Sequence, residues 1–215
     1  MKKILLPLAA MFIFFSFTLS AAEGHAQDTS PQDKAQPFPI TKYEDTISNS
    51  KSIGIQSGYG FKAWDDDHIL LNTVILQPYF TLPVTDVILE DTFLRGILEY
   101  KLEVPLGLIT TLHDRSLAGL SPLSFRYDFT GFKDRFVPYA SGSLGMTYLD
   151  VPSRVQGTKY DFILAGALGT QYFITDKWTI SAECRYFHLS NAGIKEPNRG
   201  QNYIFGLVGI GRYFR

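Results

Sequence analysis

Apolar and polar residues alternate along much of the chain after residue 50. In the segment 177–190, Trp178 and Ile180 have one parity, whereas Glu183 and Arg185 have the other. Successive side chains of a β-strand point to opposite faces, so this alternation predicts a strand with one apolar face and one charged face. No segment after the N-terminal region has the 3.6-residue apolar stripe that would indicate an amphipathic helix.

Eight such segments follow one another, separated by turns that contain Asp, Gly or Pro. They are longer than the strand length of about five to six residues that is most common in globular proteins. We therefore predict an all-β fold, an eight-stranded antiparallel β-barrel. The strands are predicted at residues 51–63, 68–80, 93–106, 121–131, 136–149, 157–173, 177–190 and 202–214.

The direction of the apolar faces distinguishes two kinds of barrel. A soluble, lipocalin-like barrel buries these faces inside, whereas a transmembrane barrel turns them toward lipid and has a polar interior. Long strands, their even number and aromatic residues at the strand ends favour the transmembrane barrel. The aromatic residues are Tyr79, Phe80, Tyr148, Tyr172, Phe173, Tyr213 and Phe214.

The N-terminus indicates export. Lys2 and Lys3 precede a long apolar run, small residues follow at Ser20, Ala21 and Ala22, and a second candidate cleavage position lies after Ala26; this is the pattern of a secretory signal peptide. Cys184 is the only cysteine, so an internal disulfide is excluded. The predicted regions are a signal peptide at 1–26, a flexible, polar leader at 27–50 and an outer-membrane β-barrel at 51–215.

Charge and histidine spacing exclude several kinds of partner. The formal net charge is −1 at pH 7, and nothing in the sequence suggests a nucleic-acid partner. His68 and His113 lie far apart, in or beside predicted surface loops, without the ligand spacing of a zinc site. We therefore expect no metal site.

The end of the seventh predicted strand carries a candidate catalytic pair, His188 and Ser190. Both have the parity of Trp178 and Ile180, so both are predicted on the lipid-facing side. With both termini in the periplasm, the seventh strand ends at the cell surface, near the outer leaflet. Serine becomes a nucleophile when an adjacent base takes its proton, and neighbours of the same parity are about 6.5 Å apart at Cα. The alternative is that the two side chains are interfacial polar groups hydrogen-bonded to a loop.

The loop after Ser190 offers donors for the negative oxygen of a tetrahedral intermediate. Backbone amides near Ala192 and Gly193, or the side-chain amides of Asn191 and Asn198, are the candidate oxyanion-supporting groups.

The stretch RYFHLSNAGIKEPNRGQN, residues 185–202, resembles the active-site stretch of the lipid A 3-O-deacylase (PagL-type) family. The family's pattern is His-x-Ser-Asn-Ala-Gly followed by Pro-Asn-x-Gly, and here it spans His188 to Gly200. The resemblance implies an eight-stranded outer-membrane barrel that hydrolyses the 3-O-linked acyl ester of lipid A, the lipid part of lipopolysaccharide, without metal or cofactor. Carried over to this chain, it makes Ser190 the nucleophile and His188 the general base.

The third member of the implied catalytic triad departs from the family. Aligned from the histidine, the family's glutamate corresponds to Asn202. An asparagine orients an imidazole by hydrogen bonding but stabilises an imidazolium less than a carboxylate does, so a slower enzyme is expected. Glu196, in the loop, is a possible replacement. Glu183 is less suitable, because its parity sends it into the barrel interior beside Arg185.

Three functions follow from these observations. The leading one is an outer-membrane serine esterase that deacylates lipid A, with lipopolysaccharide and the surrounding outer-membrane lipids as partners. The second is a small barrel that binds lipid or protein at the cell surface and has lost catalysis through the change at Asn202. The third is an esterase that acts on glycerophospholipids.

Overall fold

The computed structural model describes residues 40–63, 72–111, 115–132, 135–152 and 156–215. The predicted signal peptide at 1–26 and residues 27–39 of the predicted leader lie outside the described residues. No helix in the described ranges is long and apolar enough to cross a membrane.

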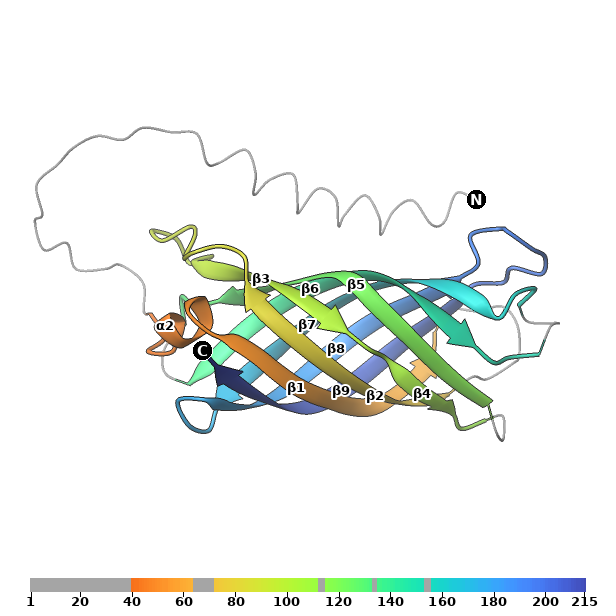
Figure 1. The fold of residues 1–215 in the computed structure, drawn as a ribbon, viewed down its shortest axis with the longest axis horizontal. Coiled ribbons are helices and arrows are strands. Elements are labelled where there is room, and N and C mark those ends of the chain that lie inside the picture. The colour runs from red at the N-terminus through yellow and green to blue at the C-terminus, as the bar shows by residue number, and fades with distance from the viewer. Residues whose placement is uncertain (1–39, 64–71, 112–114, 133–134, 153–155) are drawn as a thin grey trace, which may run out of the picture. The chain divides into compact units, whose positions relative to one another are not determined.

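One short helix and nine strands make up the described fold (Figure 1). All strand pairs are antiparallel. The elements are α2 (Glu44–Ser48), β1 (Lys51–Lys62), β2 (Thr73–Pro83), β3 (Gly96–Glu103), β4 (Leu106–Ile109), β5 (Arg115–Phe129), β6 (Phe136–Leu149), β7 (Tyr160–Phe173), β8 (Trp178–Ser190) and β9 (Gln201–Phe214).

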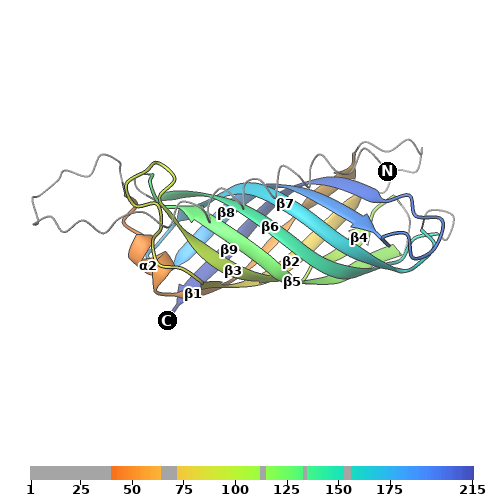
Figure 2. The same ribbon diagram turned by 90° about the horizontal axis from the view of Figure 1, so that it is seen from above.

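The strands close into a barrel with eight strand positions. β1 pairs with β2 on one side and with β9 on the other, which joins the first strand to the last. β3 and β4 together fill the single position between β2 and β5. Figure 2 shows the strands running obliquely around the barrel, as closure requires. The predicted eight-stranded antiparallel barrel is confirmed.

The interruption between β3 and β4 corrects the predicted strand at 93–106. Pro105 stands at the break and has no N–H to donate to a ladder. Backbone hydrogen bonds still hold this part of the wall, because Val104 N donates to Pro78 O at 3.0 Å and Gly119 N donates to Pro105 O at 2.8 Å.

Other predicted bounds also differ from the structure. The strand predicted at 121–131 is β5, which begins six residues earlier, at Arg115. Its register against β6 shifts between Leu120 and Leu123, around Pro122, and this irregularity hides the alternation on which the prediction rested. The strand predicted at 68–80 is β2, which runs from Thr73 to Pro83.

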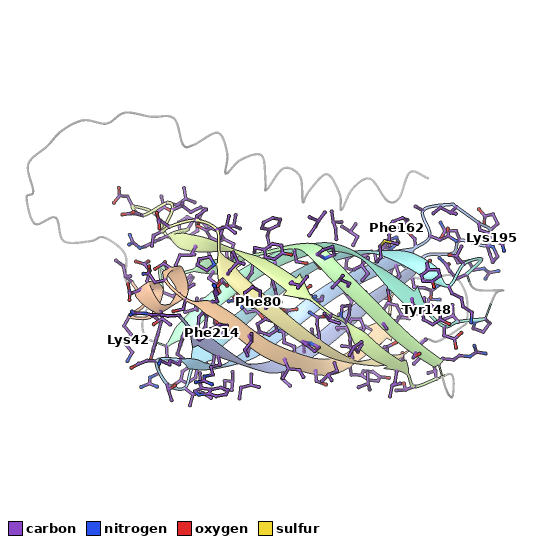
Figure 3. The ribbon with its side chains drawn as sticks, viewed as in Figure 1. Lys42, Phe80, Tyr148, Phe162, Lys195 and Phe214 are labelled. Carbon is purple, nitrogen blue, oxygen red and sulfur yellow. The ribbon has the colours of Figure 1, made fainter. Side chains whose placement is uncertain are left out.

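The outer wall of the barrel is apolar, as the parity predicts. Ile53, Phe61 and Ile180 are exposed on it, whereas Gln56 and Glu183, of the opposite parity, are buried inside. Figure 3 labels aromatic residues toward both ends of the wall, with Tyr148 and Phe162 near one end and Phe214 near the other.

Charged residues fill the middle of the barrel interior. Arg185 is the centre of one group: its two Nη atoms donate to Glu103 at 2.7 and 2.9 Å, and its Nε donates to Glu183 at 2.6 Å. Arg126 forms a second group by pairing with Glu99 and Asp128. Buried charges are tolerated when they are paired and hydrogen-bonded. The predicted placement of Glu183 inside the barrel, beside Arg185, is confirmed.

The interior is not polar throughout, which differs from the expected polar interior. Two apolar clusters lie inside the barrel, one toward each end. The first contains Ile75, Ile109, Leu117, Leu149, Val151, Ile163, Ala165, Phe187, Leu189, Tyr203, Phe205 and Leu207. The second contains Tyr43, Ile47, Ile97, Val137, Phe173 and Tyr213. The two clusters give the barrel a packed core rather than a pore.

Residues 40–50 form a plug at the end of the barrel where β1 begins (Figure 1). Tyr43 stacks on Phe173 with ring centroids 4.0 Å apart, and Ile47 of α2 is fully buried in the second cluster. The prediction of a flexible leader is therefore wrong for residues 40–50. Its polar composition hid two apolar side chains that only the closed barrel buries.

An ion pair fixes the plug. Glu44 accepts hydrogen bonds from Arg95 Nε at 2.7 Å, from Arg95 Nη2 at 2.8 Å and from Thr130 Oγ1 at 2.6 Å. Burial raises the pKa of Glu44, but the hydrogen bonds and the charge of Arg95 outweigh it, so the pKa of Glu44 is below its ordinary value of 4.5. A carboxyl group with a lowered folded-state pKa contributes stability above the unfolded-state pKa, and this contribution is lost as the pH falls through the folded-state pKa.

We expect Glu44→Gln to loosen the plug without opening the barrel. The variant keeps the side-chain volume but loses the charge-assisted hydrogen bonds from Arg95. Amide hydrogen exchange at residues 41–49 should become roughly tenfold faster above pH 5. The difference from wild type should shrink as the pH falls below 4.5, because Glu44 itself is then protonated. Asp176→Asn, in an exposed turn at the same end, is the control. Equal exchange in wild type and Glu44→Gln at pH 7 would contradict the assigned role.

Candidate functional site

The candidate site lies where β8 ends and β9 begins, at the opposite end of the barrel from α2 (Figure 1). Residues 191–200 connect the two strands. Figure 3 labels Lys195 of this connection at the same end as Tyr148 and Phe162. We call residues 191–200 the β8–β9 loop.

His188 and Ser190 lie on the outer face of β8 and are half-buried. Their neighbours Phe187 and Leu189 have the opposite parity and are buried in the first apolar cluster. Ser190 is opposite Phe162 of β7 in the ladder. The predicted facing of the pair is therefore confirmed, and the end of β8 is anchored from inside by large apolar side chains.

His188 and Asn202 meet side chain to side chain. They are direct partners in the antiparallel pairing of β8 and β9, and His188 Nδ1 is 2.8 Å from Asn202 Oδ1. A carbonyl oxygen only accepts hydrogen bonds, so Nδ1 carries the proton. In a neutral imidazole this leaves Nε2 with a lone pair, which is the state that a general base for Ser190 needs.

Neither of the other candidate acids takes the place of Asn202. Glu196 is exposed in the β8–β9 loop, where its carboxylate accepts a hydrogen bond from Asn198 N at 2.9 Å. Glu183 points into the barrel interior and pairs with Arg185.

Tyr186 belongs to the site, although the sequence reasoning did not single it out. It lies on the same face of β8 as His188, and its hydroxyl donates to Asn202 Oδ1 at 2.6 Å. The signal in the sequence was its parity, but that signal identifies a site residue only when the register of β8 against β9 is known.

Asparagine side chains shape the β8–β9 loop from within. Asn191 is fully buried, accepts from Gly193 N at 2.9 Å and donates to Lys195 O at 2.7 Å. Asn198 Oδ1 accepts from Asn191 N at 3.2 Å. The structure thus brings these predicted support residues together, and it employs the amides of Asn191 and Gly193 in holding the loop.

The loop is also tied to the neighbouring β6–β7 connection. Gln156 Nε2 donates to Asn198 Oδ1 at 3.1 Å and to Asp161 Oδ1 at 2.6 Å, and Gly157 N donates to Pro197 O at 2.6 Å. The sequence reasoning missed Gln156, because a lone glutamine in a turn has no distinguishing pattern.

Ala192 is in the left-handed region with φ 55°, and Gly193 follows with φ 80°. For an alanine this conformation carries strain of roughly 1 kcal/mol or more, and such strain is concentrated at functional sites. Within the described residues, the Ala192 N–H has no hydrogen-bond partner. Of the predicted oxyanion donors, the backbone amides of Asn191 and Gly193 and the side-chain NH₂ of Asn191 hold the loop, so the Ala192 N–H is the backbone amide that is left available.

Gly200 lies against the imidazole of His188. A Cβ at this position would be 3.2 Å from His188 Cε1 and 4.0 Å from Nε2, and the backbone φ of Gly200 is 60°. The last glycine of the Pro-Asn-x-Gly pattern is therefore required by both the backbone conformation and the limited space beside the imidazole ring of His188.

The rim near the site carries partly exposed ion pairs. Asp150 pairs with Arg115 at 3.0 Å and with Lys159 at 3.2 Å. The hydrogen bond from Lys159 is the largest of the effects that hold the pKa of Asp150 below its ordinary value, and the hydrogen bond from Arg115 adds to it. Since Lys159 is exposed and Arg115 and Asp150 are partly exposed, water and salt screen the pairs, and their contribution to stability is small.

Two other features do not enlarge the site. Among the described residues, no group of three or more His, Cys, Asp or Glu side chains is placed to hold a metal ion. An apolar groove of about 640 Å³ opens on the outer wall, but His188 and Ser190 do not line it. Its walls include Ile55, Leu76, Phe136, Ile180, Ala182, Val208 and Ile210.

Two solved structures share the fold. The outer membrane enzyme PagL is 15% identical over 73% of this chain and 97% of its own, with a TM-score of 0.50. Neisserial surface protein A is 13% identical over 76% of this chain and 97% of its own, with a TM-score of 0.52. No curated protein sequence matches the chain.

A family model described as lipid A 3-O-deacylase (PagL) matches residues 98–210. This range is more than half of the chain, and it includes His188, Ser190 and the whole β8–β9 loop. The chain therefore belongs to the lipid A 3-O-deacylase (PagL) family, and it has the fold of the bacterial outer-membrane β-barrels.

Proposed function

We propose that this protein is a serine esterase of the outer membrane that removes the 3-O-linked acyl chain from lipid A. The observation that carries the proposal is the contact of His188 Nδ1 with Asn202 Oδ1, since it leaves Nε2 as the basic nitrogen two residues from Ser190. Membership of the deacylase family supports the substrate class.

The proposed reaction has two halves. Ser190 Oγ attacks the ester carbonyl carbon while His188 Nε2 takes the hydroxyl proton. The tetrahedral oxyanion accepts a hydrogen bond from the Ala192 N–H. On collapse, the bond to the sugar oxygen breaks, and His188 returns the proton to that oxygen. Water then hydrolyses the acyl-Ser190 ester with the same base, which releases the fatty acid and restores the serine.

The facing of the pair supports an amphiphilic substrate. Ser190 is on the outer wall among apolar side chains such as Phe162, so an acyl chain reaches it from the bilayer and not from the barrel interior. The β8–β9 loop presents the exposed cations Lys195 and Arg199 beyond the end of the wall, where they suit the phosphates of lipid A. We place the site near the outer leaflet.

Ser190→Ala should abolish deacylation and leave the barrel folded. Loss of a serine nucleophile typically lowers kcat by more than roughly a thousandfold. Mass spectrometry of lipid A after incubation with refolded protein in detergent should show loss of one hydroxyacyl mass with wild type only. Heat-modifiable migration in electrophoresis verifies folding of both proteins. Activity that persists in the folded variant would reject Ser190 as nucleophile, and faster release from glycerophospholipids than from lipid A would reject the substrate.

Asn202→Asp should raise kcat by about tenfold, because a carboxylate in place of the amide stabilises the imidazolium of His188. The shape of the side chain is preserved, and the acceptor for Nδ1 stays in place. The same lipid A assay measures the ratio. The alternative function, a lipid- or protein-binding barrel without catalysis, rests on the asparagine at 202. This alternative requires wild-type deacylation activity near zero and a gain in kcat of several orders of magnitude in Asn202→Asp.

Gly200→Ala should lower kcat by more than tenfold. The added methyl group would press on His188 Cε1, and an alanine backbone is strained at the φ of 60° that Gly200 adopts. Gly193→Ala, with φ 80° and open space around the added Cβ, has the same backbone strain without contact to the imidazole. We expect the smaller loss in Gly193→Ala. An equal loss in the two folded variants would show that backbone strain alone is responsible.

A further inference from the structure

The proposed chemistry of Ser190 and His188 gives no role to the hydrogen bond between Tyr186 and Asn202. The Tyr186 hydroxyl and His188 Nδ1 converge on the same atom, Asn202 Oδ1, at 2.6 and 2.8 Å. Tyr186 is opposite Ile204 and His188 is opposite Asn202, so Tyr186 reaches Asn202 diagonally across the β8–β9 pairing.

An asparagine in this place creates a problem that a carboxylate does not have. The two ends of an amide have nearly the same shape, but one is an acceptor and the other a donor. If the NH₂ end faced His188, Nδ1 would have to accept, and the proton would sit on Nε2. The imidazole would then have no lone pair directed to Ser190. Both oxygens of a carboxylate accept, so either of its orientations holds the productive tautomer.

The geometry around Tyr186 selects one orientation of the amide. A separation of 2.6 Å is normal for an O–H···O bond and short for an N–H···O bond, for which about 2.9 Å is typical. The hydroxyl therefore meets the oxygen end of Asn202, and the same oxygen is then presented to His188.

We propose that Tyr186 is a positioning residue that fixes the Asn202 amide with its oxygen toward His188 and thereby sets the histidine tautomer. Tyr186 does not touch the substrate in this role; it acts through Asn202. The inference rests on the proposed function for its effect on rate, but the tautomer itself is a property of the resting protein. With Tyr186 in place, the asparagine presents an acceptor to His188, as the family's glutamate does in either orientation because both of its oxygens accept.

Nitrogen NMR of the histidine ring tests the tautomer without any substrate. The refolded protein carries ¹⁵N-labelled histidine, and His188→Gln identifies the signals of His188 among the other histidines. In wild type, neutral His188 should show Nδ1 protonated and Nε2 unprotonated. In Tyr186→Phe the signals should shift toward protonated Nε2. In Asn202→Asp and in Tyr186→Phe/Asn202→Asp, Nδ1 should carry the proton. Protonated Nε2 in wild type, or an unchanged tautomer in Tyr186→Phe, would overturn the proposal.

A double-mutant cycle tests the consequence for rate. Tyr186→Phe should lower kcat roughly fivefold in the wild-type background, as expected for one lost hydrogen bond, with KM unchanged. In the Asn202→Asp background the same change should cost less than twofold, because the carboxylate needs no orientation. Tyr160→Phe, an exposed tyrosine of the outer wall, is the matched control and should have no effect. An equal loss in both backgrounds would mean a structural role for Tyr186.

The two experiments separate the two proposals. If lipid A is not deacylated but His188 changes tautomer as described, the proposed function fails and the positioning role stands. If lipid A is deacylated while Tyr186→Phe leaves both the tautomer and kcat unaltered, the positioning role fails alone.

Discussion

The structure depends on closure of the β-sheet. Lipid offers no hydrogen bonds to a backbone, so each strand of the wall must pair on both sides, and β1 meets this need by pairing with both β2 and β9. A closed wall leaves each strand residue only two directions, outward or inward. His188 and Ser190 face outward because Phe187 and Leu189 face the interior. The proposed reaction chemistry and the core packing are thus assigned to alternate residues of one strand.

The filled interior explains how a site on a barrel wall is held precisely. Phe187 packs against Phe205 with ring centroids 5.8 Å apart, which fastens β8 to β9 directly beneath His188 and Asn202. Farther along the interior, Arg185 joins Glu183 of its own strand to Glu103 of β3. Well-packed interiors transmit displacement instead of absorbing it. The imidazole and its amide partner are therefore fixed by the body of the barrel, and only the turn that is proposed to support the oxyanion belongs to a loop.

The sequence predicts features that depend on neighbouring residues, but it does not predict contacts between residues that are far apart in the chain. The alternation of period two determined the facing of His188 and Ser190, and the family motif indicated Asn202. Two prolines made the predicted strand bounds wrong: Pro105 stands between β3 and β4, and Pro122 lies at the register shift of β5, near the positions where the predicted strands end and begin. Tyr186, Gln156 and Gly200 acquire their roles from contacts across strands or loops, which need the register. The packing of Tyr43 on Phe173 joins residues 130 positions apart, and local sequence has no sign of it.

The plug has a consequence for the order of assembly. Its partners come from widely separated parts of the chain: Arg95, Thr130, Phe173 and Tyr213. Segment 40–50 is made before all of them, yet its docking surface exists only when β9 has joined β1. Contacts between such distant segments form late, because the intervening chain must first be ordered. Docking of Tyr43 and Ile47 is therefore a late folding event: it follows the pairing of β9 with β1 and then stabilises the closed barrel next to the start of β1.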